Sequence, residues 1–456
     1  MTRFREEKDT MGVVRVPEQA YYGAQTQRAV ENTAIGELKM PCEFIHALAL
    51  IKAAAAEVNC RLGLLDPKRS EAVAAAAREV LAGGWDDQFV VGVFQTGSGT
   101  SSNMNVNEVI ASRANEMLTG EKGGKTPVHP NDHVNLGQSS NDTVPSAIHI
   151  AAVRSIRNRL TPALRRLHQA LSAKAEEFSD IRKIGRTHLQ DAVPMTLGQE
   201  FSGYARQVEL GIERLEGPDS RLTELAIGGT AVGTGVNAHP EFADSVIAWV
   251  SRETGIHFRK ARNHFEAQAA RDAAVEASGV LKTVAVSLAK IANDVRWLGS
   301  GPRCGIGEIK LPSLQPGSSI MPGKVNPVVP EAVLQVAAQV AGNDTTITLC
   351  GQAGNFELNT MMPLIAHNLL QSIGLLADAA GVLADKCVAG IAADREACAA
   401  FLEKSLALVT GLVPRIGYDR AAEIAMQAYA TGRTVREVLS EAKLVPKEDI
   451  DALLNP

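Results

Sequence analysis

The chain has 456 residues, of which 45% are hydrophobic, and it carries a formal net charge of −5. This length is sufficient for several buried cores, and we expect two or three domains. No run of Lys and Arg interrupts the mixed charge pattern, which argues against nucleic-acid binding. Any anionic ligand must therefore be captured by a local site.

The N-terminal residues 1–9 are mostly charged, and no later stretch is long and apolar enough to cross a bilayer. We therefore expect no membrane partner and a cytoplasmic location. The six cysteines form no C-x-x-C pair and have no regular spacing. In a long chain this pattern indicates free thiols, mostly buried.

The first part of the chain, residues 1–138, is expected to form a mixed, mostly helical domain. Alanine clusters at 53–56 and 74–77 favour closely packed helices. Glycine-containing stretches at 97–100 and 120–124 predict turns. Aromatic residues make up only 4% of the chain, and the predicted class is mainly α.

The middle of the chain, residues 139–392, has the clearest helical periodicity. Three runs place apolar residues three or four positions apart: Val153, Ile156, Leu160, Leu164, Leu167 and Leu171; Leu197, Phe201, Tyr204, Val208, Ile212 and Leu215; and Leu281, Val284, Leu288, Ile291, Val295 and Leu298. Pro162 is expected to kink or divide the first of these helices. Helical runs also follow Pro330 and Pro363, so we predict a central bundle of five long helices. Shorter amphipathic helices are expected in a small C-terminal domain at 393–456.

Four polar segments stand at the ends of these predicted helices, at 97–103, 138–142, 185–191 and 317–327. Helix N-termini offer free N–H groups and positive potential, which suit carboxylates. For residues 139–142, ordinary helix capping is the simpler explanation when the segment is taken alone. The stretch at 97–100 could be a plain turn, because it lacks the third glycine or the lysine of phosphate-binding loops.

Three other patterns also have simple structural explanations. Glu331 follows Pro330 and would lie in the first turn of a helix, where its carboxylate favours the helix dipole. A lone histidine such as His188 is more often a surface or core residue than an acid–base group. In the segment 129–133, a proline disfavours a helical pair of histidine ligands and no acidic cluster completes a metal site. We therefore expect no metal.

The segment 317–327 reads G-S-S-I-M-P-G-K-V-N-P. It closely resembles the signature G-S-S-x-M-P-x-K-x-N-P of the fumarase/aspartase superfamily. The resemblance extends over nearly the whole chain, through Tyr21–Gln27, Ser98–Thr100, Ser139–Asp142 and Gly228–Asn237. It implies a fumarase/aspartase-like fold, mainly α, in which a central bundle of five long helices is flanked by smaller N- and C-terminal domains.

Within the superfamily, T-H-L-Q-D at 187–191 resembles class II fumarases, since aspartases usually have glutamine in place of the histidine. The segments 301–309 and 237–242 are similar to fumarases as well. Residues 328–331 and 191–196 are familiar from aspartases, so an aspartate ammonia-lyase stays open as an alternative. The resemblance implies a cofactor-free hydro-lyase that interconverts fumarate and L-malate through an aci-carboxylate intermediate.

The resemblance also implies roles for individual residues. Ser318 would take the carbon-bound proton, and His188 paired with Glu331 would act on the hydroxyl side, directly or through a water. The residues implied to bind substrate are Ser98, Gly99, Thr100, Ser139, Ser140, Asn141, Thr187, Ser319, Lys324, Val325 and Asn326. A second anion site is implied at His129, Pro130, Asn131 and Asp132.

In this superfamily the subunits form a homotetramer, and three subunits contribute to each active site. A monomer is therefore expected to be inactive, and the implied partner is a small dicarboxylate. A non-catalytic structural relative is a remote alternative. The presence of Ser318, Lys324, His188 and Glu331 together weighs against it.

Overall fold

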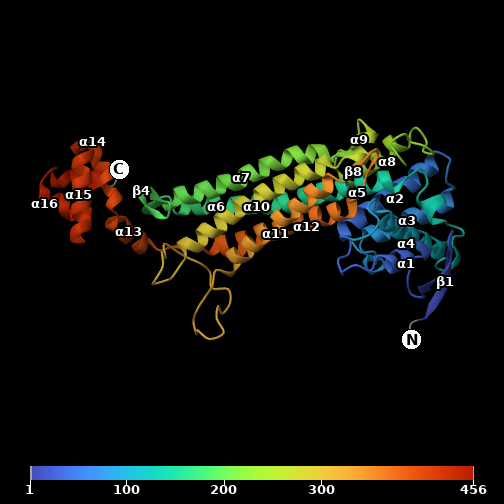
Figure 1. Ribbon diagram of the computed structural model, residues 1–456, viewed down its shortest axis with the longest axis horizontal. Coiled ribbons are helices and arrows are strands. Elements are labelled where there is room, and N and C mark those ends of the chain that lie inside the picture. The colour runs from blue at the N-terminus through green and yellow to red at the C-terminus, as the bar shows by residue number, and fades with distance from the viewer. Residues whose placement is uncertain (1–2, 455–456) are drawn as a thin grey trace. The chain divides into compact units, whose positions relative to one another are not determined.

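The computed structural model describes residues 3–454, and helices dominate it (Figure 1). This confirms the predicted mainly-α class. The chain divides into two compact units. Unit 1 contains the chain up to Pro162 together with Glu213–Thr283 and Ala338–Ala377, and unit 2 contains Ala163–Ile212, Val284–Ala337 and the chain from Asp378 onward. The division into domains at 138 and 392 stays a prediction.

Each short helix or strand lies within a single unit. Those of unit 1 are β1 Phe4–Asp9, β2 Gly12–Pro17, α1 Ala24–Asn32, α2 Cys42–Arg61, α3 Pro67–Leu81, η1 Asp86–Gln88, α4 Thr100–Thr119, η2 Pro130–Val134, α5 Ser140–Ser155, η3 Ile156–Leu160, β5 Glu224–Leu225, α8 Phe242–Thr254, β6 Arg259–Lys260, α9 His264–Ala269, β8 Gly354–Asn355 and β9 Leu358–Asn359. Those of unit 2 are β3 Arg182–Thr187, β4 Gln190–Thr196, β7 Ile309–Lys310, η4 Leu383–Cys387, η5 Val388–Gly390, β10 Ala392–Ala393, α13 Arg395–Lys404, η6 Leu406–Leu412, α14 Val413–Ile416, α15 Tyr418–Thr431, α16 Val435–Ala442, η7 Lys447–Asp449 and α17 Ile450–Leu454. The strands form two-stranded ladders, antiparallel for β1–β2, β3–β4, β7–β10 and β8–β9 and parallel for β5–β6.

The remaining helices have residues in both units: α6 Thr161–Glu177, α7 Leu197–Leu222, α10 Asp272–Leu298, α11 Val328–Gly351 and α12 Met362–Val382. The periodic run in α10 is buried as predicted, from Leu281 at 0% exposure to Leu298 at 4%. Polar contacts join these helices within each unit. In unit 2 the Tyr204 hydroxyl donates to Asp294 over 3.0 Å, and in unit 1 the Asn343 amide donates to Gln371 over 2.9 Å.

The helix is divided next to Pro162, as predicted. The irregularity is the π turn η3, directly before it, where the Thr161 N–H bonds to the Ile156 carbonyl five residues back. Proline has no N–H, and its ring crowds the carbonyl four residues before it, so a wider turn upstream relieves the strain. Pro330, in contrast, does not start its helix, because α11 begins two residues earlier, at Val328. Glu331 still lies in the first turn of α11, as predicted.

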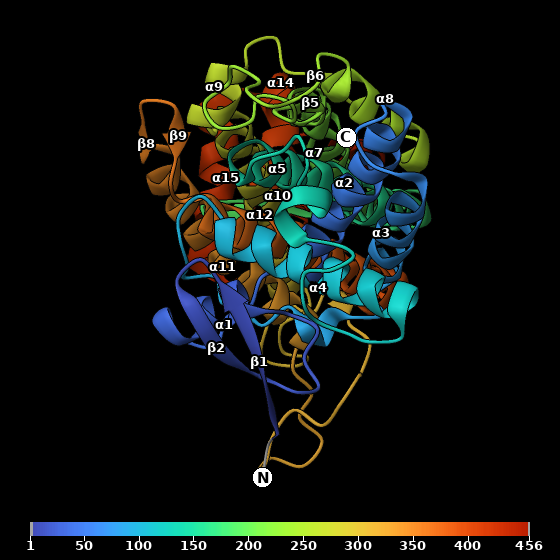
Figure 2. The ribbon, with the colours of Figure 1, turned by 90° about the vertical axis from the view of Figure 1, so that its right-hand side faces the viewer.

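The core of unit 1 forms where α2 packs against α3, α5 and α8 (Figure 2). Alanines fill much of α2, and Ala53, Ala54 and Ala55 are at most 1% exposed. Small side chains let neighbouring helices approach closely, as the alanine clusters predicted. In unit 2, α15, α16 and α17 enclose a separate apolar cluster centred on Leu412 and Leu439.

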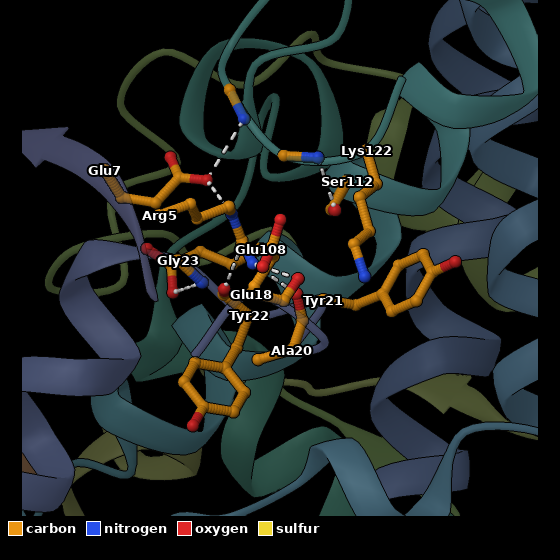
Figure 3. Close-up of polar contacts among 12 residues, drawn as sticks. Arg5, Glu7, Glu18, Ala20, Tyr21, Tyr22, Gly23, Glu108, Ser112 and Lys122 are labelled. Carbon is orange, nitrogen blue, oxygen red and sulfur yellow. Dashed lines mark hydrogen bonds and ion pairs between the residues drawn. The ribbon is translucent and has the colours of Figure 1, made fainter. Parts of the chain in front are cut away.

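The N-terminal segment is anchored to α4 by a buried carboxylate (Figure 3). Glu108 is 7% exposed, and it accepts bonds from the backbone N–H groups of Gly23, Gln25 and Thr26 at 2.9, 2.9 and 3.0 Å. These are free N–H groups at the start of α1, so a residue of another helix caps α1. Nearby, the Arg5 guanidinium donates to the carbonyls of Ala20 and Tyr22.

Replacing Glu108 with alanine should therefore destabilise unit 1. Three N–H groups at the start of α1 would lose their acceptor, and we expect the free energy of unfolding to fall by about 3 kcal/mol. Chemical denaturation monitored by circular dichroism measures this change. Glu6→Ala, on the exposed face of β1, is the matched control and should be nearly neutral. A Glu108→Ala protein as stable as this control would contradict the capping role.

Within residues 3–454, no single helix has the length and apolar character needed to span a membrane. One bent pair, Arg395–Lys404 with Leu406–Ile416, meets the length and composition criteria together.

Candidate active site

Two helices of unit 1 begin at the same place. The Thr100 hydroxyl, at the first residue of α4, lies 2.6 Å from the Ser140 hydroxyl, at the first residue of α5. The Ser98 hydroxyl extends this series of hydroxyls, because it lies 2.8 Å from the Thr100 hydroxyl. Free N–H groups and the positive ends of two helix dipoles therefore converge on a row of three hydroxyls. This arrangement, which we call the hydroxyl row, suits a carboxylate.

Two glycines allow the loop before α4 to take this path. A Cβ on Gly97 would lie 1.6 Å from the Thr360 carbonyl oxygen, whose segment is held by a bond from the Met362 N–H to the Gly97 carbonyl. Gly99 has a φ of 74°, and a Cβ there would lie 2.9 Å from Val144. Gly99, which was predicted to bind substrate, thus allows the backbone conformation that leads into α4.

The capping explanation holds for part of the segment 139–142. The Ser139 hydroxyl accepts a bond from the Asn141 N–H, and Asp142 accepts from the Ser139 N–H, which forms a capping box. The Asn141 amide donates to the Ala231 carbonyl over 2.9 Å. Ser140 instead directs its hydroxyl to Thr100. Capping therefore accounts for Ser139 and Asp142 but not for Ser140.

Asp142 also ties a second loop to the start of α5. Its carboxylate accepts the N–H groups of Gly228 and Thr230, both at 2.9 Å, and it is fully buried. Burial raises the pKa of Asp142 to about 6, although its backbone bonds and the charge of Lys52 favour the ionised form. Asp142 was not among the site residues predicted from the sequence.

The segment predicted as a second anion site forms the π turn η2. His129 caps it, since its Nδ1 accepts bonds from the N–H groups of Asn131 and Asp132. Asn131 and Asp132 are exposed, whereas Pro130 is buried. Burial lowers the pKa of His129. Among residues 3–454, no group of three or more His, Cys, Asp or Glu side chains is placed to hold a metal ion.

His188 lies in unit 2, at the tip of the hairpin formed by β3 and β4. Both turn residues, His188 and Leu189, have positive φ angles of 57° and 58°, as a two-residue hairpin turn requires. His188 and Thr187 are exposed. The hairpin projects the imidazole away from the chain's own core, so a ligand or another chain can reach it.

A buried ion cluster holds this hairpin in place. Arg186, two residues before His188, forms a bidentate pair with Glu308 at 2.8 and 2.9 Å. Lys183 is 1% exposed and lies 2.8 Å from Glu200 and 3.3 Å from Glu308. Glu308 is fully buried between the two cations. Lys183 and Arg186 of β3 are thereby paired within the unit, while the turn at the end of this strand stays accessible.

The signature segment forms an exposed loop in unit 2. The Ser318 hydroxyl accepts bonds from the N–H groups of Ile320 and Met321 at 3.2 and 2.9 Å. Gly317 closes the loop, because its N–H bonds to the Lys324 carbonyl and its own carbonyl accepts from the Asn326 amide. N–H donors stabilise the deprotonated form of a group that accepts them. Ser319, Lys324 and Val325 are exposed around this turn.

The structure does not join all of the predicted catalytic residues. Among residues 3–454 of one chain, His188 forms no hydrogen bond or ion pair with Glu331. Ser98, Thr100 and Ser140 do form one cluster, and Gly317, Ser318, Lys324 and Asn326 form another.

The buried polar residues that contact the turn before α5 were not predicted from the sequence. Lys52 is fully buried and donates to Asn135 and Gln138, and Asn103 donates to the same Asn135 oxygen. A signal was present, because Lys52 interrupts the otherwise apolar run 47–56. A lysine inside such a run must find buried acceptors.

Comparisons with known proteins identify the family. Residues 12–342 match the family described as lyase, and residues 408–456 match the fumarase C C-terminus. A protein of Nitrosomonas europaea named fumarate hydratase class II is 58% identical over 456 residues, which cover 100% of this chain and 99% of that protein. The crystal structure of class II fumarase from Schistosoma mansoni has a TM-score of 0.96 at 41% identity, and the match covers 100% of this chain and 98% of that one. A second solved structure, a fumarate lyase:delta crystallin from Brucella melitensis, has a TM-score of 0.95 at 47% identity, with 100% of this chain and 99% of that chain covered. Together with a hydroxyl row at two helix N-termini and an intact signature loop, these similarities show that the chain belongs to the class II fumarate hydratase family.

Proposed function

We propose that this protein catalyses the reversible hydration of fumarate to L-malate, a step of the tricarboxylic acid cycle. The observation that carries the proposal is the full-length similarity to proteins named class II fumarate hydratase. The hydroxyl row and the signature loop support it, since both offer neutral donors and N–H groups to a small dicarboxylate. Neutral donors can hold a dianion and still release it.

In the malate-to-fumarate direction, Ser318 removes the proton from the carbon next to one carboxylate. The electron pair moves onto that carboxylate and forms an aci-carboxylate with two negative charges. Lys324, Asn326 and the N–H of Ser319 stabilise this charge. The two N–H groups that bond to the Ser318 hydroxyl support its alkoxide form.

The carbon–oxygen bond then breaks, and the hydroxide leaves as water with a proton delivered from His188, which Glu331 orients. The double bond of fumarate forms from the electron pair of the aci-carboxylate. The proton on Ser318 returns to solvent, and His188 is reprotonated, so the cycle balances. Hydration of fumarate follows the same steps in reverse. Ser98, Gly99, Thr100, Ser139, Ser140, Asn141, Thr187 and Val325 complete the substrate site.

We also propose that the working form is a homotetramer in which three subunits contribute to each site. The proposal is supported by the exposure of the His188 turn and of the signature loop, which leaves both accessible to another subunit. We also propose three domains with boundaries at 138 and 392, and a cytoplasmic location. The proposal includes a second anion site at His129–Asp132 and no cofactor.

The proposed function is tested by giving the purified protein L-malate and following the ultraviolet absorbance of fumarate. We expect fumarate to form, and no ammonia to be released from L-aspartate in a parallel assay. No fumarate formation from malate would contradict the proposed function, and ammonia release from L-aspartate that exceeds malate turnover would reverse the assignment in favour of the ammonia-lyase.

A further inference from the structure

Lys52 is an ionisable side chain placed inside the core of unit 1. It lies on α2, where its side chain is 0% exposed among alanines and leucines. Burial lowers the pKa of Lys52 to about 7, and the opposite charge of Asp142 acts against this shift. A core without a role for this charge would be more stable with an apolar side chain of the same size. The position therefore requires an explanation beyond packing.

The ammonium group makes two specific contacts. It donates to the Asn135 side-chain oxygen and to the Gln138 side-chain oxygen, both at 2.9 Å. The Asn135 amide in turn donates to the Gln138 carbonyl, and the Gln138 amide donates to the carbonyls of Val134 and Leu136. Residues 134–138 thus form a turn whose two amide side chains both point back to Lys52.

This turn leads directly into the start of α5. Gln138 precedes Ser139, the N-cap residue, and Ser140 follows with its hydroxyl on Thr100. Asn135 also binds α4, because its oxygen accepts the amides of Asn103 and Asn107 at 3.2 and 3.1 Å. One oxygen therefore connects α2, α4 and the turn before α5.

We propose that Lys52 is a positioning residue for substrate binding, a role that rests on the proposed function. Its ammonium group holds the turn 134–138 and thereby sets the distance between the N-termini of α4 and α5, where the hydroxyl row receives a carboxylate. Lys52 touches no substrate. Its loss misplaces Ser140 and Asn141 and weakens the binding of dicarboxylates, whereas the proton-transfer groups on Ser318 and His188 are unaffected.

Two substitutions distinguish the effect of the hydrogen bonds of Lys52 from the effect of its side-chain volume. Lys52→Met keeps the volume and removes both donors, and Lys52→Gln keeps N–H donors. We expect Lys52→Met to raise the KM for fumarate at least tenfold with a change in kcat of less than threefold, and Lys52→Gln to recover part of the loss. Lys174→Met is the matched control, because Lys174 is 9% exposed and its ammonium binds the Ile391 carbonyl and Glu177. This control should leave KM unchanged.

Hydrogen exchange does not depend on enzyme turnover, so it tests the positioning role of Lys52 independently of the proposed function. Hydrogen exchange should be faster at residues 138–143 in Lys52→Met than in the wild type, and unchanged there in Lys174→Met. If the wild type hydrates fumarate and Lys52→Met has the wild-type KM, the positioning role is wrong and the proposed function stands. If the wild type is inactive, the proposed function is wrong, and unchanged exchange at residues 138–143 would overturn the positioning role as well.

Discussion

Ser318→Ala should lower kcat for malate dehydration about 1,000-fold, which corresponds to about 4 kcal/mol of lost transition-state stabilisation. The hydroxyl accepts two backbone N–H bonds, so its removal takes away the base and leaves these two donors without their acceptor. The KM should change far less, because the hydroxyl row and Lys324 remain. Steady-state kinetics with malate, followed by fumarate absorbance, measures both parameters.

Ser313→Ala is the matched control for Ser318→Ala. Ser313 is exposed in the segment before the signature loop and has no place in the proposed site. This variant should keep wild-type kinetics. A Ser318→Ala enzyme that retains more than a tenth of the wild-type kcat would show that another group takes the carbon-bound proton.

His188→Asn should lower kcat about 100-fold, as expected when a positioned acid–base group is removed. Asparagine is the substitution of choice, because it tolerates the positive φ of 57° at this turn position. The hairpin should therefore keep its shape. His257→Asn, at an exposed histidine outside the site, should match the wild type.

A mixing experiment then tests how the site is assembled. If one site takes Ser318 and His188 from different subunits, tetramers that combine Ser318→Ala chains with His188→Asn chains contain some sites with both groups intact. Refolding the two inactive variants together should restore part of the activity. Activity that stays at the level of the separate variants would show that a single chain supplies both residues, contrary to the proposed sharing.

The residues of the ion cluster that holds the His188 hairpin could not be predicted from the sequence. Lys183, Arg186 and Glu308 look like ordinary surface charges in the sequence. Their burial follows only when β3 packs against the segment before β7, which lies more than a hundred residues later in the chain. Charge type is a local property, whereas burial depends on contacts between distant segments.

By itself the sequence determined the mainly-α class, the periodic run of α10, the polar helix ends within 97–103 and 138–142, and the family. These features depend on short-range patterns, namely apolar spacing, capping residues and the signature loop. Only the tertiary structure decided that α4 and α5 begin within 2.6 Å of one another at Thr100 and Ser140. It alone showed that Glu108 caps α1 and that Lys52 holds the turn before α5. The physical reason is the same in each case, since a buried polar or charged group must find its partners across the fold, and the spacing of residues along the chain does not specify them.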